Sequence, residues 1–139
     1  MTVLDPSDVQ GVVVDVTTLL GLTSTAVPSV AFTGLCAETR IHGGFEGVVQ
    51  VRCEPAVARH AAISMGLGEA ADDAEVAVRE LTNVVAGNLK ALLPPTDEPA
   101  VLSPPSELTD SGGDAIGGCT VACDAGRIDV RVFQTPRVP

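Results

Sequence analysis

The chain has 139 residues and a formal net charge of −10, with 45% hydrophobic residues but only 2% aromatic ones. This length and apolar fraction suffice for one domain with its own core, which must be built from Val, Leu, Ile and Ala. The negative charge repels phosphate backbones and anionic lipid headgroups, and no basic stripe offsets it. Neither nucleic acid nor a membrane surface is therefore expected as a partner.

The sequence also predicts where the protein is located and whether its cysteines bind a metal ion. No apolar run approaches the roughly 20 residues that a membrane span needs, and residues 1–7 lack the basic and apolar regions of a signal peptide, so we expect a cytoplasmic protein. Cys119 and Cys123 are four positions apart, not the three of a Cys-x-x-Cys pair, and both histidines are isolated, so no metal site is expected. The cysteines lie in apolar, strand-like runs, which is typical of small buried hydrophobes.

The first element in the chain is a helix over about residues 7–20, where valines and leucines recur at helical spacing. Asp5 is placed to cap it and Gly21 to end it. Two strands over residues 30–42 and 45–53 follow, and the Gly43-Gly44 turn between them predicts a hairpin. Gly47 in the second strand predicts a bulge or a close approach of another segment.

Two helices come next, over about residues 55–65 and 72–93. Asp72 and Glu75 have the spacing of a capping box at the start of the second of these, and Pro94-Pro95 would end it. The chain then runs through a loop that is rich in Pro, Ser, Asp and Gly.

The remaining elements are a short strand at 100–103, a second hairpin with strands at 115–123 and 127–133, and a loose tail at 134–139. Ile128, Val130 and Val132 alternate with charged residues, which indicates a sheet with one buried face. Hairpins and consecutive helices together predict a single α+β domain over residues 1–139. Its largely antiparallel sheet would consist of two hairpins plus a short strand, packed by three helices.

The helix at 72–93 has unusual residues on its solvent side. On a helical wheel one arc is apolar and should face the core: Ala74, Ala77, Leu81, Val85, Leu89 and Leu92. The opposite side gathers Val76, Glu80, Asn83, Gly87 and Lys90. Asn and Gly are poor helix formers, so a purely structural surface would favour other residues there. Glu80 and Asn83 are three residues apart, so their side chains are neighbours on the helix. Such a pair fits a functional site, but it also occurs on ordinary solvent-exposed helix faces. Asn88 is expected to face the apolar arc as a hydrogen-bonded structural amide.

Three motifs follow one another in a specific order. A glycine-rich hairpin spans residues 41–49, Glu80-Leu81-Thr82-Asn83 runs on into Ala86-Gly87, and Leu102-Ser103-Pro104-Pro105 lies about twenty residues downstream. Over roughly residues 7–134 the chain resembles the CheX-like branch of the CheC/CheX/FliY phosphatases of bacterial chemotaxis. The single Glu-x-x-Asn helix favours the CheX branch, and this resemblance implies a homodimer with one site per subunit.

The resemblance implies a phosphatase that acts on the aspartyl phosphate of a CheY-like response regulator receiver. The receiver would bring its own magnesium ion and lysine, so no cofactor is expected on this chain. The chain would need only to orient a water in line with the leaving oxygen, and a carboxamide suits this task because it both donates and accepts hydrogen bonds. Asn83 would hold the water, Glu80 would pair with the receiver's lysine, and Gly87 would permit a close approach. Arg79 and Val76 would affect the choice of partner, Val76 standing where the family often has Asp or Ser.

Two other functions remain open from the sequence. One is a non-catalytic module of the same fold that binds receivers or a scaffold, which the apolar Val76 and the tail would suit. The other is a structural or assembly protein, since the family fold is shared with flagellar-switch components.

Overall fold

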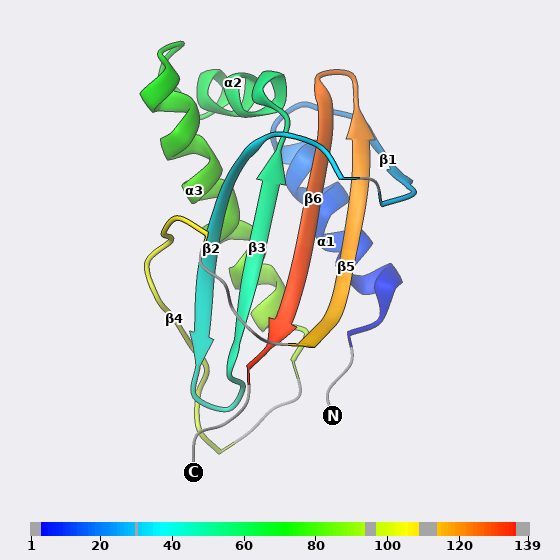
Figure 1. Ribbon diagram of the computed structural model, residues 1–139, viewed down its shortest axis with the longest axis vertical. Coiled ribbons are helices and arrows are strands. Elements are labelled where there is room, and N and C mark those ends of the chain that lie inside the picture. The colour runs from blue at the N-terminus through cyan, green and yellow to red at the C-terminus, as the bar shows by residue number, and fades with distance from the viewer. Residues whose placement is uncertain (1–3, 30, 94–96, 109–113, 136–139) are drawn as a thin grey trace.

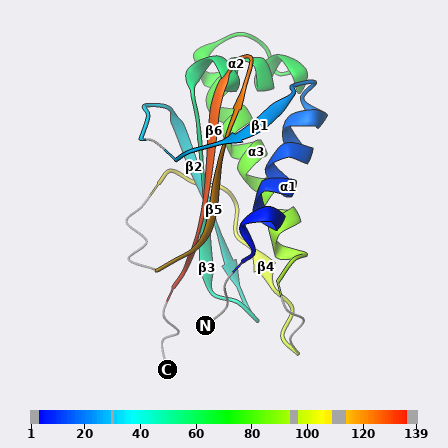
Figure 2. The same ribbon diagram turned by 90° about the vertical axis from the view of Figure 1, so that its right-hand side faces the viewer.

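The fold consists of one antiparallel sheet with helices on one of its faces. The computed structural model describes residues 4–29, 31–93, 97–108 and 114–135. In chain order its elements are α1 (Pro6–Leu19), β1 (Ser24–Val27), β2 (Leu35–His42), β3 (Gly47–Cys53), α2 (Pro55–Ser64), α3 (Ala71–Lys90), β4 (Val101–Leu102), β5 (Asp114–Cys123) and β6 (Gly126–Gln134). The six strands lie in the order β1-β5-β6-β3-β2-β4. Helices α1 and α3 cover one face and α2 lies at one end (Figures 1 and 2). The predicted α+β class with three helices is confirmed.

Helix α1 begins and ends where the sequence predicts. Asp5 caps it, because its Oδ1 accepts hydrogen bonds from the Ser7 hydroxyl at 2.7 Å and the Ser7 amide at 2.8 Å. These bonds stabilise the charged form and hold the pKa of the Asp5 carboxyl below its usual value. Gly21 follows the helix with a φ of +77°, a conformation that favours glycine. The valines Val9 and Val13 face the sheet and are buried.

The first hairpin is confirmed, but its strands are shorter than predicted. Strand β2 begins at Leu35 and β3 at Gly47, and residues 31–34 form no strand. The prediction also missed β1, which pairs with β5 so that Ser24 lies opposite Cys123. Strand β1 has only four residues, lacks apolar alternation and pairs with a segment distant in the chain, so no local pattern reveals it.

Gly47 confirms the predicted close approach of two segments. A Cβ at this position would overlap the Phe45 ring and the backbone carbonyl of Phe133. Pairing around Gly47 stays in register, whereas the bulge of the sheet lies in β5, between Ala115 and Gly117.

The predicted start of the third helix is wrong by two residues. Ala70, not Asp72, is its N-cap, and the Oδ2 of Asp73 accepts a hydrogen bond from the Ala70 amide at 3.0 Å. Asp73 thus takes the position that the sequence assigned to Glu75, which starts the helix earlier. The helix ends at Lys90, and Pro94-Pro95 lies outside the described residues.

The C-terminal half follows the prediction closely. Strand β4 falls within the expected short strand, and β5 and β6 form the second hairpin with Gly126 at a φ of +141°. The expectation of a loose tail is wrong for its first two residues: Gln134 ends β6, and the Thr135 amide donates to the Glu46 carbonyl at 3.0 Å. Residues 136–139 lie outside the described part of the chain.

The core lies between the sheet and the helices. Ile128, Val130 and Val132 of β6 are buried, as their alternation predicts. Cys53 is also fully buried, and this burial raises the pKa of its thiol far above the usual value. The other three cysteines are only partly buried, and all four are free thiols. No helix in the described ranges is long and apolar enough to cross a membrane.

The two sides of α3 should respond differently to truncation. Leu81→Ala should lower the free energy of unfolding by about 2–5 kcal/mol, because Leu81 is 1% exposed and its loss leaves a cavity. Val76→Ala, at a residue 39% exposed on the other side, should change it by no more than about 0.5 kcal/mol. Urea unfolding followed by circular dichroism measures both, and equal losses would contradict the orientation of the helix.

Candidate functional site

Helix α3 is fixed to the rest of the molecule by one buried side. It packs against β2, β3, α1 and α2. The buried residues are Ala74, Ala77, Val78, Leu81, Thr82, Val85, Ala86 and Leu89. This confirms the predicted apolar arc with one exception. Leu92 lies beyond the end of the helix and is 41% exposed, so its assignment to the core is wrong.

The opposite side of α3 carries all five residues to which the sequence assigned catalytic or partner-binding roles. Val76, Arg79, Glu80, Asn83 and Gly87 are all exposed. Residues four apart lie one above the other on a helix. Arg79, Asn83 and Gly87 therefore form one row, and Val76 and Glu80 begin a second row beside it.

The second row continues with Val84, which the sequence analysis did not single out. Val84 is 38% exposed and lies one turn beyond Glu80, as Val76 lies one turn before it. The Glu80 carboxylate thus emerges between two exposed apolar side chains. The spacing of four residues from Glu80 was the signal that could have identified Val84.

Two asparagines of α3 differ in their hydrogen bonding. Asn88 was expected to face the apolar arc, which is wrong because it is exposed. Its amide is nevertheless satisfied, since Nδ2 donates to the Val84 carbonyl at 2.8 Å. No hydrogen bond or ion pair within the described ranges involves the side chains of Asn83 or Glu80. Their polar atoms are directed to solvent and are available to a partner or a water molecule.

The absence of a side chain at Gly87 is not required by the fold. A Cβ built there would meet nothing within 4 Å, and the residue is exposed in the last turn of a regular helix, three residues before its end. Glycine is costly at such a position compared with alanine. Its presence leaves the backbone bare one turn beyond Asn83, where another surface can come close.

The candidate site is a helix face, and a small pocket lies beside it. This pocket has a volume of about 90 Å³, and Arg79 and Glu75 of α3 line it together with Glu107. Sites for small molecules usually occupy 300 Å³ or more, so an exposed helix face suits a macromolecular substrate better. Glu107 closely follows the Pro104-Pro105 motif, which therefore ends next to the candidate site.

Other groups that could carry chemistry are engaged elsewhere. The Nε2 of His60 lies 2.9 Å from the Leu20 carbonyl, and the Nδ1 of His42 lies 3.2 Å from Glu46. Within the part of the chain that the structure describes, no three His, Cys, Asp or Glu side chains are grouped so as to hold a metal ion.

Comparison with known families identifies the chain. The sequence profile described as "Chemotaxis phosphatase CheX" matches residues 35–123, which is well over half of the chain and includes α3 with Glu80 and Asn83. The chain belongs to the CheX family. This membership makes it a chemotaxis phosphatase and confirms the resemblance that its motifs indicated.

Solved structures of the CheX family share the fold. The chemotaxis protein CheX from Desulfovibrio desulfuricans matches with a TM-score of 0.71 and 17% identity, covering 92% of this chain and 97% of that one. CheX from Vibrio vulnificus gives 0.73 and 15%, covering 91% and 93%. CheX in a CheX–CheY–BeF3–Mg²⁺ complex from Borrelia burgdorferi gives 0.62 and 14%, covering 95% and 100%. No curated protein sequence matches the chain significantly.

Replacing Gly87 should stabilise the protein. Gly87→Ala should raise the free energy of unfolding by up to about 1 kcal/mol, because it removes the entropy cost of a helical glycine without a clash. Gly11→Ala in α1 is the matched control, since a Cβ there also meets nothing within 4 Å and a similar gain is expected. A loss of stability in Gly87→Ala alone would show that the fold itself needs this glycine.

Proposed function

We propose that this CheX-family protein hydrolyses the aspartyl phosphate of a CheY-like receiver domain, in bacterial chemotaxis or related two-component signalling. The observation that carries the proposal is the exposed pair of Glu80 and Asn83 on one face of α3, with both side chains unpaired within the described residues. Membership of a phosphatase family favours this function over a non-catalytic receiver-binding or scaffold module.

In the proposed reaction this chain has only to orient the attacking water. A water oxygen forms a bond to phosphorus while the bond from phosphorus to the receiver's aspartate oxygen breaks, giving phosphate and a free carboxylate. The receiver supplies the magnesium ion and lysine that offset the charge on the phosphoryl oxygens. The Asn83 amide accepts a hydrogen bond from the water and directs its oxygen in line with the breaking bond.

Glu80 holds the two proteins in register by pairing with the receiver's lysine. Val76 and Val84 lie one turn away on either side and are partly exposed. When a receiver covers them, they exclude water around the ion pair, which strengthens its attraction because the local dielectric constant falls. The absence of a side chain at Gly87 lets the receiver approach closely, and Arg79 favours receivers with an acidic group opposite it.

The partner and the assembly are part of the same proposal. The Borrelia burgdorferi structure contains CheX together with CheY, and this supports the proposal that the present chain also binds a CheY-like partner. The receiver is met in its phosphorylated form, and both proteins are in the cytoplasm. We also propose a homodimer with one site per subunit. Its support is the family resemblance, because three valines of α1, Val9, Val13 and Val16, are buried within the subunit and are not available to a second one.

Asn83→Ala should abolish accelerated phosphate release while leaving docking intact. The rate at saturating phosphorylated receiver should fall at least about a hundredfold, because the attacking water is no longer held in line. Asn88→Ala is the matched control: it removes the same amide from the same helix, but that amide is bonded to the Val84 carbonyl, and the rate should stay within about twofold of wild type.

A second variant separates docking from chemistry. Glu80→Gln should weaken binding of the receiver and raise KM more than it lowers the maximal rate. Binding can be followed by calorimetry with a beryllofluoride-treated receiver. Receiver binding without any acceleration of phosphate release by the wild-type chain would establish the non-catalytic module instead.

The oligomeric state is tested by sedimentation equilibrium at micromolar concentration. A homodimer should give twice the chain mass of 14.1 kDa. A single species at the monomer mass over the whole concentration range would exclude the dimer but leave the assignment of Asn83 intact.

A further inference from the structure

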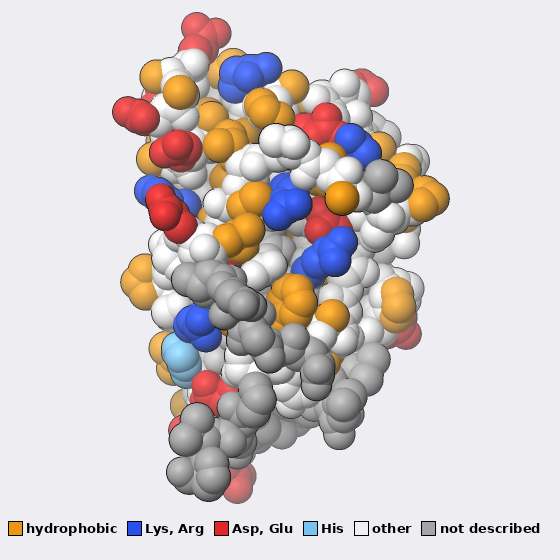
Figure 3. All heavy atoms as spheres, viewed as in Figure 1, with side chains coloured by type: hydrophobic (Ala, Val, Ile, Leu, Met, Phe, Trp, Pro, Cys, Tyr) orange, Lys and Arg blue, Asp and Glu red, His pale blue; other side chains and the backbone are white. Residues whose placement is uncertain are grey.

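The face of the sheet opposite α1 and α3, here called the open face, has a charge unlike that of the chain as a whole. The chain has eight Lys and Arg residues against eighteen Asp and Glu residues. Four of the eight, Arg40, Arg52, Arg127 and Arg131, lie on β2, β3 and β6 at positions that alternate with the buried, helix-facing ones. Figure 3 views the molecule from this side and shows basic side chains across the face.

In two ion pairs on this face the carboxylate lies deeper than the guanidinium group. Arg131 is 51% exposed, whereas Asp129, which its Nε contacts at 2.9 Å, is only 13% exposed. Arg40 is 41% exposed above Glu38, which is 1% exposed. A ligand that approaches the open face therefore meets guanidinium groups first, although the chain carries a net charge of −10.

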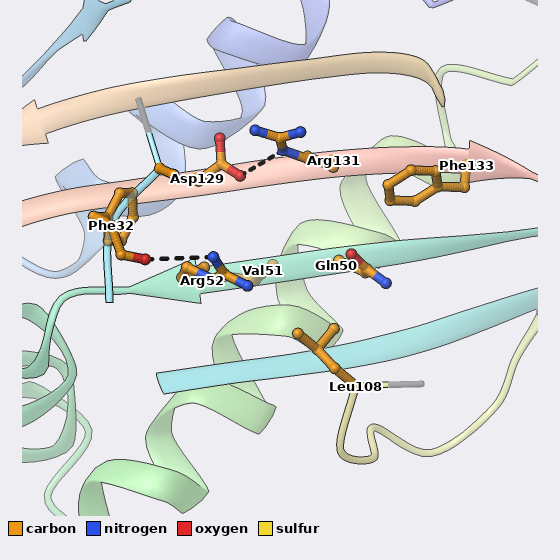
Figure 4. A pocket seen from close by; sticks show the side chains of 9 residues that line it. Phe32, Gln50, Val51, Arg52, Leu108, Asp129, Arg131 and Phe133 are labelled. Carbon is orange, nitrogen blue, oxygen red and sulfur yellow. Dashed lines mark hydrogen bonds and ion pairs between the residues drawn. The ribbon is translucent and has the colours of Figure 1, made fainter. Parts of the chain in front are cut away.

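A cavity of about 300 Å³, here called the open-face pocket, lies at the centre of this face (Figure 4). The paired strands β3 and β6 form its floor, with Gln50 opposite Arg131 and Arg52 opposite Asp129. Its rim is formed by Ala31, Phe32, Leu108 and Phe133. Two of the three phenylalanines of a chain without Trp or Tyr thus line one cavity.

The hydrogen bonds around the floor fix both arginines. The Oδ1 of Asp129 accepts from the Thr120 hydroxyl at 2.6 Å while Oδ2 accepts from the Nε of Arg131. Arg52 donates from Nε to the Cys36 sulfur at 3.1 Å and from Nη1 to the Phe32 carbonyl at 3.3 Å. Among the described residues, nothing occupies the terminal nitrogens of Arg131 or the Nη2 of Arg52.

We propose that the open-face pocket binds a small organic anion, with its carboxylate or phosphate group between Arg52 and Arg131. Guanidinium groups match the oxygens of both anions, and their hydrogen bonds are stronger for the charge. The apolar body of the ligand packs on Phe133 and Leu108 at the rim. The volume is at the lower end of the range for small-molecule sites. The floor is polar, with Gln50, Arg52, Asp129 and Arg131, and the apolar side chains lie at the rim.

The open-face pocket and the proposed phosphatase site are formed by different residues. Gln50 and Arg52 alternate along β3 with Val49 and Val51, which are buried on the side of the helices. The two sites therefore lie on opposite sides of the sheet, and failure of one assignment leaves the other untouched.

The test is a titration of the full chain with phenyl phosphate, benzoate and phenol, followed by amide NMR shifts. The two anions should bind saturably at millimolar concentration and shift the amides of residues 50–52 and 129–133, whereas neutral phenol should not. The tighter of the two anions identifies the preferred acidic group. The lack of Trp and Tyr rules out intrinsic fluorescence as a readout.

Arg131→Ala should weaken binding of the preferred anion at least about tenfold, as expected when a charge-assisted hydrogen bond is lost. Arg131→Gln should do the same while keeping most of the side chain. Arg59→Ala, at an exposed arginine of α2, is the control and should bind as wild type. Absence of saturable binding, shifts confined to α3, or an undiminished affinity in both Arg131 variants would overturn the proposal.

Discussion

The packing of α3 onto β2 and β3 is the constraint on which the site depends. Val78, Leu81, Val85 and Leu89 are each about 1% exposed in this contact. Burying a side chain of this size contributes about 1.5–3 kcal/mol. The helix is therefore held by its inner side, and the poor helix propensities of Asn83 and Gly87, at most about 1 kcal/mol each, are tolerated. The residues on the outer side of the helix are therefore not restricted to those that favour helix formation.

A site of this kind needs no cluster of catalytic groups. Its features are two polar side chains with no partner in the described chain, a bare stretch of backbone and two exposed valines. Such a surface has no nucleophile among these residues, so hydrolysis there would depend on a water molecule and on the partner that holds the phosphoryl group. It could complete a site that another protein already holds, and under the proposed function a helix face would serve as well as a cleft.

The parts of the fold that were predictable are those encoded by neighbouring residues. Helix α1, with its cap at Asp5, and the hairpin that Gly126 closes both follow from periodicity and turn chemistry. Strand β1 was missed because its stability comes from pairing with β5, which is remote in sequence. The start of α3 was misplaced since Asp72 and Asp73 are adjacent carboxylates, and only the structure shows which one folds back on Ala70.

The site was predictable to a similar degree. The helical wheel correctly placed Glu80 and Asn83 on the exposed side of α3, because both residues lie far from the boundary between its apolar and polar sides. The family resemblance then singled out these two residues. Asn88 lies near that boundary, where small differences in packing decide exposure, and its bond to the Val84 carbonyl follows from local geometry that a wheel does not represent.

The open face shows why a net charge describes a protein surface poorly. In sequence, Arg127, Asp129 and Arg131 form the polar half of an alternating strand, and Asp129 cancels the charge of one of the two arginines. In the structure the carboxylate of Asp129 lies beneath the Arg131 guanidinium. The electrostatic potential that a ligand meets therefore depends on how deeply each charged group lies as well as on how many charged groups there are. Repulsion by the whole chain acts on extended polyanions that cover many of its carboxylates. A ligand small enough to enter one cavity interacts mainly with the two arginines on its floor.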